Sequence, residues 1–288
     1  MKIGAHVSAG GGLPKAIDRA VEIGAETVQI FGSSPQMWGT TKHSDEDKAA
    51  FRARAAEAGV GPAFLHGIYL INLATPNETN LKRGVGSLVS HMILASEIGA
   101  AGVIFHPGSH KGEGFDQVLP RVAGAMREVL ERTPEDALLI IETNAGAGDC
   151  IGDRFAEVAA MMDAVKSPRV KVCFDTCHVY VSGYDITTAE GVARTMEEFQ
   201  REIGLEHLVA VHANDAKAPL GSNKDRHENI GQGHIGIAGF EHVMAHPAFA
   251  EVPFLLEVPG FAGQGPDREN VEILKEIRGR VRPRTAKA

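Results

Sequence analysis

Short apolar runs alternate with longer segments of helical periodicity along most of the chain. Eight runs rich in Val, Ile, Leu and Phe span residues 2–7, 27–31, 62–65, 102–105, 137–141, 170–174, 208–211 and 253–256. Helices are predicted in six intervening segments, at residues 13–23, 45–58, 78–98, 154–165, 189–203 and 268–278. Near-continuous apolar strands that alternate with helices are typical of buried parallel sheets. The pattern predicts an α/β fold, a (β/α)8 or TIM barrel of eight parallel strands with outer helices, and an open doubly wound sheet is the alternative.

The chain length fits one such barrel, since 288 residues is within its usual range. We expect a single barrel domain over residues 1–279 and a basic, disordered tail over residues 280–288. The glycine-rich stretch at residues 4–12, GAHVSAGGG, lacks the spacing of a dinucleotide-binding fingerprint, and no phosphate-binding P-loop motif is present. The sequence therefore offers no support for a nucleotide-binding fold.

Six consecutive apolar runs, the third to the eighth, end in a histidine, an aspartate or a glutamate. In an α/β barrel the carboxyl ends of all strands meet at one rim, where sites are built. That rim would collect His66, His106, Glu142, Asp175, His212 and Glu257. Three further candidates, His178, Asp225 and His227, would join it from the loops that follow the sixth and seventh runs. The rest of the polar segment at residues 214–236 is expected to lie outside the core.

Any one of these residues has a structural explanation; Asp175, for example, could simply cap the segment after its strand. Six ionisable groups in one cleft are harder to explain, because buried charges need compensation. Bound cations would supply it, and imidazole with carboxylate suits Zn²⁺, with Mn²⁺ as an alternative in one site. Nine ligands exceed the needs of one ion, so two or three ions sharing a bridging carboxylate are expected. Closely spaced metal ions favour hydrolysis of phosphate esters.

The other histidines have simpler interpretations. His6 and His110 lie close to the ends of the first and fourth runs, where they could orient metal ligands through hydrogen bonds. His91 falls inside a predicted helix, and a surface position is expected for it.

Charge, cysteine content and the length of apolar runs limit the class of protein and the compartment that the sequence predicts. The net charge of −8 argues against a strongly basic nucleic-acid-binding protein, although bound cations would weaken that argument. Three cysteines are too few for a disulfide framework, so buried thiols and a reducing cytoplasm are expected. No run of 18 apolar residues is present, which predicts no membrane span.

Several longer motifs resemble one known family. The chain carries GAHVSAGGG, HGIYLINLA, FHPGSH, IETNAG, CFDTCHVYVSGYD, HANDAK, DRHENIGQGHIG and LLEVPG in order between Lys2 and Ile277. They resemble the motifs of endonuclease IV, the family of zinc-dependent endonucleases that act at abasic sites in DNA. The resemblance implies a monomeric barrel that cuts damaged double-stranded DNA on the 5′ side of an abasic site, leaves a 3′-hydroxyl and also trims blocked 3′ ends.

The resemblance also implies roles for individual residues. One zinc would be held by His66, His106 and Glu142. A second would be held by Glu142, Asp175, His212 and Glu257, with Glu142 as the bridge, and a third by His178, Asp225 and His227. Glu142 and Glu257 would be the catalytic residues, with a hydroxide held between two zincs as the nucleophile.

The same resemblance implies contacts with DNA. Tyr69 matches a residue that enters the base stack, and Trp38 would add aromatic surface. Many relatives carry an arginine where this chain has Gln36, which puts an insertion role for Gln36 in doubt.

Two other functions compete with the nuclease. A sugar isomerase or epimerase with a xylose-isomerase-like barrel would use similar ligands at the strand ends, but it has no use for a third ion at His178, Asp225 and His227. A metal-stabilised binding protein without turnover is the second alternative.

Overall fold

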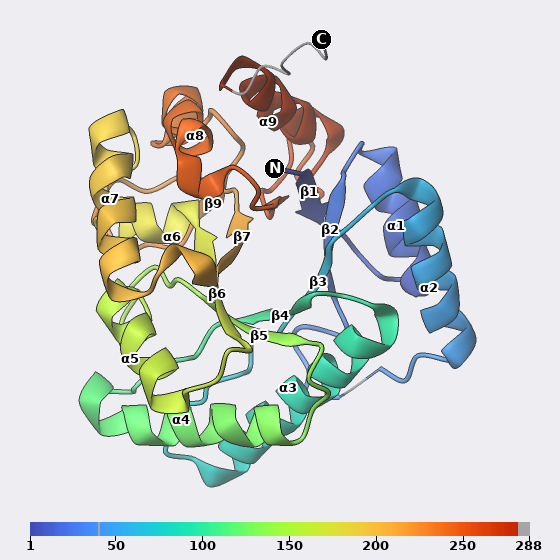
Figure 1. Cartoon of the computed structure of the whole chain (residues 1–288), viewed down its shortest axis with the longest axis vertical. Coiled ribbons are helices and arrows are strands. Elements are labelled where there is room, and N and C mark those ends of the chain that lie inside the picture. The colour runs from blue at the N-terminus through green and yellow to red at the C-terminus, as the bar shows by residue number, and fades with distance from the viewer. Residues whose placement is uncertain (40, 282–288) are drawn as a thin grey trace.

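The computed structural model describes residues 1–39 and 41–281. Eight strands close into a parallel barrel in the order β1, β10, β7, β6, β5, β4, β3, β2, and Figure 1 looks down this barrel. The strands are β1 Ile3–His6, β2 Thr27–Phe31, β3 Ala63–His66, β4 Gly102–Phe105, β5 Leu138–Glu142, β6 Val170–Asp175, β7 Leu208–His212 and β10 Phe254–Leu256. The predicted closed barrel is confirmed, and the open sheet is wrong.

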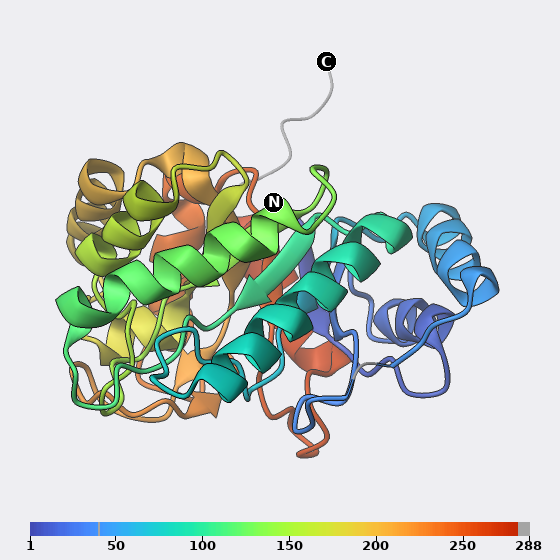
Figure 2. The same cartoon turned by 90° about the horizontal axis from the view of Figure 1, so that it is seen from below.

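Helices surround the barrel, and Figure 2 shows α3 and α4 running diagonally along its outside. The long helices are α1 Leu13–Glu22, α2 Asp45–Ala58, α3 Glu78–Ile98, α4 Phe115–Glu131, α5 Phe155–Val165, α7 Ala189–Glu202, α8 Gly236–Ala245 and α9 Arg268–Val281. A short helix, α6 Thr176–Val181, follows β6 directly. Two short 3₁₀ turns, η1 Leu205–His207 and η2 Pro247–Phe249, precede β7 and β10. None of the helices in residues 1–39 and 41–281 combines the length and apolarity that a membrane crossing requires.

Besides the short α6, two helices occupy segments for which no helix was predicted. Helix α4 contains Pro120, which removes a backbone donor from the helix interior, yet it buries an apolar stripe that includes Val122 and Met126. Helix α8 follows a glycine-rich polar segment and buries Phe240 and Val243. Packing against the barrel outweighs the local signals in both cases.

The last helix is longer than expected. Helix α9 continues to Val281, two residues into the predicted tail, and residues 282–288 lie outside the described part of the chain. Arg278 of this helix forms a two-point ion pair with Glu26, from Nη1 to Oε2 at 2.6 Å and from Nη2 to Oε1 at 3.0 Å. The pair joins the last helix to the turn before β2.

The barrel interior is a separate small cluster of side chains, made of Phe64, Ile104, Ile140, Cys173, Ala210 and Leu255. Successive side chains of a strand point to opposite faces, so a residue two positions further on points the same way. Two positions after these six residues stand His66, His106, Glu142, Asp175, His212 and Glu257. The interior layer therefore lies directly below the strand-end residues, on the same inner face of the barrel.

Candidate metal centre

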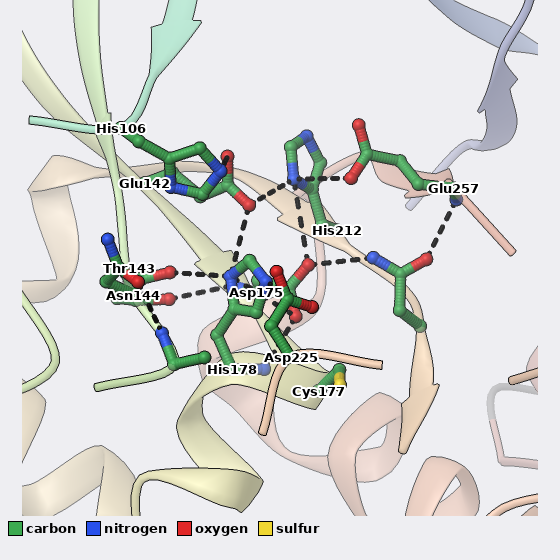
Figure 3. Close-up of polar contacts among 12 residues, drawn as sticks. His106, Glu142, Thr143, Asn144, Asp175, Cys177, His178, His212, Asp225 and Glu257 are labelled. Carbon is green, nitrogen blue, oxygen red and sulfur yellow. Dashed lines mark hydrogen bonds and ion pairs between the residues drawn. The ribbon is translucent and has the colours of Figure 1, made fainter. Parts of the chain in front are cut away.

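Ionisable side chains converge at the carboxyl ends of six neighbouring barrel strands, as Figure 3 shows for most of them. His66, Glu142, Asp175 and His212 are the last residues of β3, β5, β6 and β7. His106 and Glu257 follow directly after β4 and β10. The structure thus brings together the six strand-end residues that the sequence placed at this rim.

Among the described residues, five overlapping groups of candidate ligands have their ligand atoms within 4.8 Å of one another, and three of these groups match the sets that the resemblance implied. In the first, which we call group 1, His66 and His106 flank one oxygen of Glu142. Their Nε2 atoms lie 3.0 Å and 3.3 Å from Glu142 Oε2.

Group 2 lies on the other side of the same carboxylate. Oε1 of Glu142 is 2.9 Å from Nδ1 of His212, which in turn is 3.3 Å from Glu257 Oε2 and 3.8 Å from Asp175 Oδ2. These four residues form one ligand group. Glu142 therefore stands between groups 1 and 2 and turns one oxygen to each.

Group 3 consists of His178, Asp225 and His227. Oδ1 of Asp225 lies 3.3 Å from Nε2 of both histidines. His178 stands on helix α6, not in a loop as expected, while His227 begins the short strand β9 His227–Glu228. Asp225 is 48% exposed, so group 3 opens to solvent more than groups 1 and 2.

Asp175 serves two purposes at once. Its Oδ1 accepts the backbone N–H of His178 at 2.8 Å and so caps α6, which is the structural role considered for it from the sequence. Its Oδ2 accepts a hydrogen bond from the side-chain amide of Asn214 at 2.7 Å and belongs to the ligand side. The cap and the metal-ligand interpretation are therefore compatible.

The donor set fits divalent cations. The side-chain nitrogens Nε2 of His178 and Nε2 of His227 are buried and have no hydrogen-bond partner among the described residues. Buried polar atoms of this kind need a partner, and an ion would provide one. No lysine or arginine is among the described residues that line the surrounding cleft of about 470 Å³. Bound cations are the natural compensation for Glu142, Asp175 and Glu257.

The protonation states of Glu142 and His106 suit metal binding as well. Burial would raise the pKa of Glu142, but the nearby His106 and His212 hold it well below its usual range. Burial lowers the pKa of His106 to about 4, so this imidazole is neutral at pH 7. Burial also raises the pKa of Cys177, a thiol that lies in a further group with Asp175 and His227.

The segment after β7 is far less exposed than its polarity suggested, and the prediction that it lies outside the core is wrong for its first residues. Asp215 opens the short strand β8 Asp215–Ala216 and is fully buried. Its carboxylate accepts backbone N–H groups from its neighbour Ala216 and from four later residues, Gly231, Gly233, Ile235 and Gly236. A Cβ at Gly233 would lie 2.5 Å from Asp215 Oδ1, so only glycine fits there. Asp215 thereby stabilises the conformation of the segment that carries Asp225 and His227.

The predictions for three other histidines agree with the structure in one case and differ from it in two. His6 Nδ1 lies 3.3 Å from Glu257 Oε1, as expected for a residue that orients a ligand. Nδ1 of His110 accepts the backbone N–H groups of Gly112 and Gly114 and shapes its own loop, so the orienting role predicted for it is wrong. His91 is 2% exposed, and the surface position predicted for it is also wrong.

Comparisons with known proteins agree with this geometry. Residues 17–277 match the profile of a family described as a xylose isomerase-like TIM barrel. Relatives named probable endonuclease 4 include one from Natronomonas pharaonis, 40% identical over 90% of this chain and 92% of its own length. Another, from Trichlorobacter lovleyi, is 39% identical over 96% of this chain and 99% of its own length. The chain belongs to the endonuclease IV family.

Solved structures extend this result. The crystal structure of endonuclease IV from Thermus thermophilus superposes with a TM-score of 0.86 at 31% identity, covering 97% of this chain and 100% of that one. As a member of the endonuclease IV family, the chain is a nuclease, a hydrolase of phosphodiester bonds. A D-tagatose 3-epimerase-like protein also superposes, with a TM-score of 0.74 at 20% identity, covering 99% of this chain and 100% of that one. That likeness shows a shared fold.

Tyr69, one of the residues expected to contact DNA, lies beside the candidate metal centre of this endonuclease IV family member. Tyr69 is 63% exposed, and its ring centroid is 5.4 Å from that of Phe31, which is 5.6 Å from the ring of His66. Its backbone N–H donates to the carbonyl of Pro35 at 3.0 Å, so it is tied to the loop that carries Gln36. Gln36 is exposed, whereas Trp38 is partly buried against the core.

Proposed function

We propose that this protein is a DNA-repair endonuclease that cuts on the 5′ side of an abasic site and leaves a 3′-hydroxyl. It would use about three Zn²⁺ ions, one in each ligand group, with Mn²⁺ as an alternative in one of them. The observation that carries the proposal is Glu142, whose two oxygens face separate ligand groups at 2.9–3.3 Å, beside a third group at Asp225. Such an arrangement suits several closely spaced ions better than one.

The chemistry would be divided between the ions and the protein. When bound, the ions would supply an activated water at neutral pH and would neutralise charge on the phosphate. Glu142 and Glu257 would be the catalytic carboxylates, since Glu142 belongs to groups 1 and 2 and Glu257 belongs to group 2. Glu142 would also reduce the repulsion between neighbouring cations, since its negative charge lies between them.

The shape of the surface favours a polymer as the substrate. The cleft over the ligand groups shares His6, Phe31, Gly265 and Pro266 with a larger cleft of about 1110 Å³. A strand that extends beyond the reacting phosphate can be accommodated there. Trimming of blocked 3′ ends would use the same ligand groups, since it breaks the same type of bond.

The sugar epimerase remains the second candidate because its fold is shared. Two features favour the nuclease. The pair of joined clefts is open, whereas a small polyol is better held in a closed pocket. Group 3, with a half-exposed Asp225, adds a third set of ligands for which an isomerase with one or two ions has no use. A metal-stabilised binding protein without turnover would show no product at all in the test below.

A duplex with one tetrahydrofuran abasic analogue, labelled at its 5′ end, tests the proposal. Incision should occur only on the 5′ side of the analogue, and the product should be extended by a DNA polymerase, which requires a 3′-hydroxyl. Metal analysis of the same washed preparation should give about three divalent ions per chain. An intact duplex, or one ion or fewer in an active preparation, would contradict the proposal, and ketose epimerisation would favour the alternative.

We also propose that the enzyme acts as a monomer in the cytoplasm. The three cysteines are free thiols, which suits a reducing compartment. Sedimentation of the zinc-loaded protein with and without the duplex would test the oligomeric state.

A further inference from the structure

A buried glutamine lies against the residues of group 2. Gln29 is on β2, pairs in register with His6 of β1, and is fully buried. A buried amide without hydrogen bonds would cost free energy, so its partners reveal its role. All of them belong to the residues around group 2.

Each polar atom of the Gln29 amide has a distinct partner. The nitrogen Nε2 donates to Glu257 Oε1 at 2.6 Å and also lies 2.9 Å from Nδ1 of His6. The oxygen Oε1 lies 2.8 Å from Nε2 of His212. An amide has N–H donors on its nitrogen and a carbonyl acceptor, so Gln29 can donate to Glu257 through Nε2 while Oε1 accepts from His212.

The amide can take only one orientation in this network. If the amide were turned over, its oxygen would face the carboxylate of Glu257, and acceptor would meet acceptor. In the observed orientation His212 must carry a proton on Nε2, because a carbonyl oxygen can only accept. Nδ1 of His212 is then the atom that faces Glu142 and Glu257, at 2.9 Å and 3.3 Å.

We propose that Gln29 is a positioning residue for group 2, which holds His212 by Nε2 and Glu257 by Oε1 so that their other ligand atoms face a common point. The inference rests on the metal centre proposed above. Outer partners of this kind fix the orientation of ligating imidazoles and carboxylates and strengthen the site. Gln29 joins β2 to β7 and β10 and so ties ligands from distant parts of the chain to a single amide.

Two substitutions and one control separate positioning from packing. Gln29→Leu fills similar space without polar atoms. Gln29→Glu keeps an acceptor for His212 but loses the donors and sets a carboxylate against Glu257. Thr27→Val is the matched control, since Thr27 is fully buried on the same strand and its hydroxyl donates to the carbonyl of Pro62 at 2.5 Å, away from the ligands.

The first measurement is the NMR signal of the His212 Nε2–H in protein labelled with ¹⁵N-histidine, with and without zinc. We expect a proton protected from exchange in the wild type, Thr27→Val and Gln29→Glu, and its loss in Gln29→Leu. Because this signal needs no metal and no DNA, it decides the His212 contact even if the proposed function fails. An unchanged signal in Gln29→Leu would overturn the inference.

The second measurement is competition for Zn²⁺ between the loaded protein and a chelator of known affinity. Both Gln29 variants should release one ion about 10–100-fold more readily than the wild type, whereas Thr27→Val should not. Equal retention in all variants, or an equal loss in Thr27→Val, would show that the amide only fills space. If Gln29→Leu does not fold, Gln29→Glu decides the question through its metal affinity.

Discussion

Asp175 and His178 are joined by a hydrogen bond of 2.8 Å, which the backbone N–H of His178 donates to Oδ1 of Asp175. Because this bond caps α6, a residue of group 2 fixes the helix that presents a residue of group 3. One residue of group 2 and one residue of group 3 therefore stand on one continuous stretch of backbone, β6 and α6. The other two members of group 3 come from the segment after β7 and can be changed without touching this stretch.

Group 3 separates the nuclease from the epimerase. His227→Ala and Asp225→Asn should abolish incision of the abasic duplex while leaving most of the metal in groups 1 and 2. Incision and metal content are measured on the same preparation. Glu228→Gln is the control, because this neighbour in β9 faces Lys217 at 3.6 Å. Normal incision by either group 3 variant would show that the segment is a solvated loop without a role in incision.

Asp215 should matter for stability rather than for chemistry. Asp215→Asn replaces one acceptor oxygen by an amide donor among converging N–H groups, so the free energy of unfolding should fall by about 2–4 kcal/mol. Asp163, exposed on α5, provides the control Asp163→Asn. Urea unfolding measures both. Equal stability of the two variants would show that the backbone of residues 231–236 holds its shape without the carboxylate.

Glu142→Gln should reduce incision by several orders of magnitude with the barrel intact. The neutral amide cannot offset two cations, and its NH₂ group would face ligand nitrogens that also need an acceptor. Incision rates and circular dichroism test this. Glu157→Gln is the control, since Glu157 is a partly buried glutamate that accepts the backbone N–H of Gly152 at 2.7 Å. A rate like that of the wild type would remove the bridging role from Glu142.

Tyr69 should contribute to recognition of the lesion. An enzyme that acts on a duplex must open the base stack, and an aromatic ring can replace stacking worth about 1–3 kcal/mol per base. Tyr69→Ala should weaken binding of an abasic duplex about 10–100-fold, whereas Tyr69→Phe should bind like the wild type. Gln36→Ala should have a smaller effect. Gln36→Arg should tighten binding and steepen its salt dependence, because it adds a phosphate-binding charge.

Fluorescence anisotropy at several salt concentrations measures these affinities. The melting temperature of each variant is recorded beside them, although the exposed ring of Tyr69 makes unfolding an unexpected cause of any loss. Normal binding by Tyr69→Ala would refute the proposed stacking role of Tyr69.

Because of the Glu26–Arg278 ion pair, the free energy of unfolding should depend on pH in the acidic range. Burial would raise the pKa of Glu26, but hydrogen bonds from Arg278 and from the backbone of Ile3 lower it below its usual value. A carboxyl whose folded pKa is depressed stabilises the fold above its unfolded pKa, and this contribution is lost as pH falls through the folded pKa. Glu26→Gln should therefore cost about 1 kcal/mol at pH 7, a modest value because both side chains are partly exposed.

Unfolding of the metal-free protein in urea at pH 7 and below pH 4 tests this. The difference between wild type and Glu26→Gln should shrink in acid, and a constant difference would contradict the assignment. Glu276→Gln on the same helix serves as the control.

Much of this structure could be predicted from the sequence. The strands were found because their apolar runs are nearly continuous, and α3 was found between its correct ends because it is long and periodic. Identifying the strand-end ligands required only that parallel strands point their carboxyl ends to one rim. Helices α4 and α8 were missed because Pro120 and the glycine-rich segment before Gly236 are local signals against a helix.

The sequence by itself determined which six strand-end residues meet, since strand polarity and a period of two bring them to the rim of any such barrel. Only the tertiary structure decided the distances within the groups that the resemblance implied, which oxygen of Glu142 faces which histidine, and that Asp215 is buried. It alone joined Gln29 to Glu257, 228 residues apart in the chain. The reason is physical, because a hydrogen bond is set by distance and angle between strands, and the register that fixes both depends on closing the barrel.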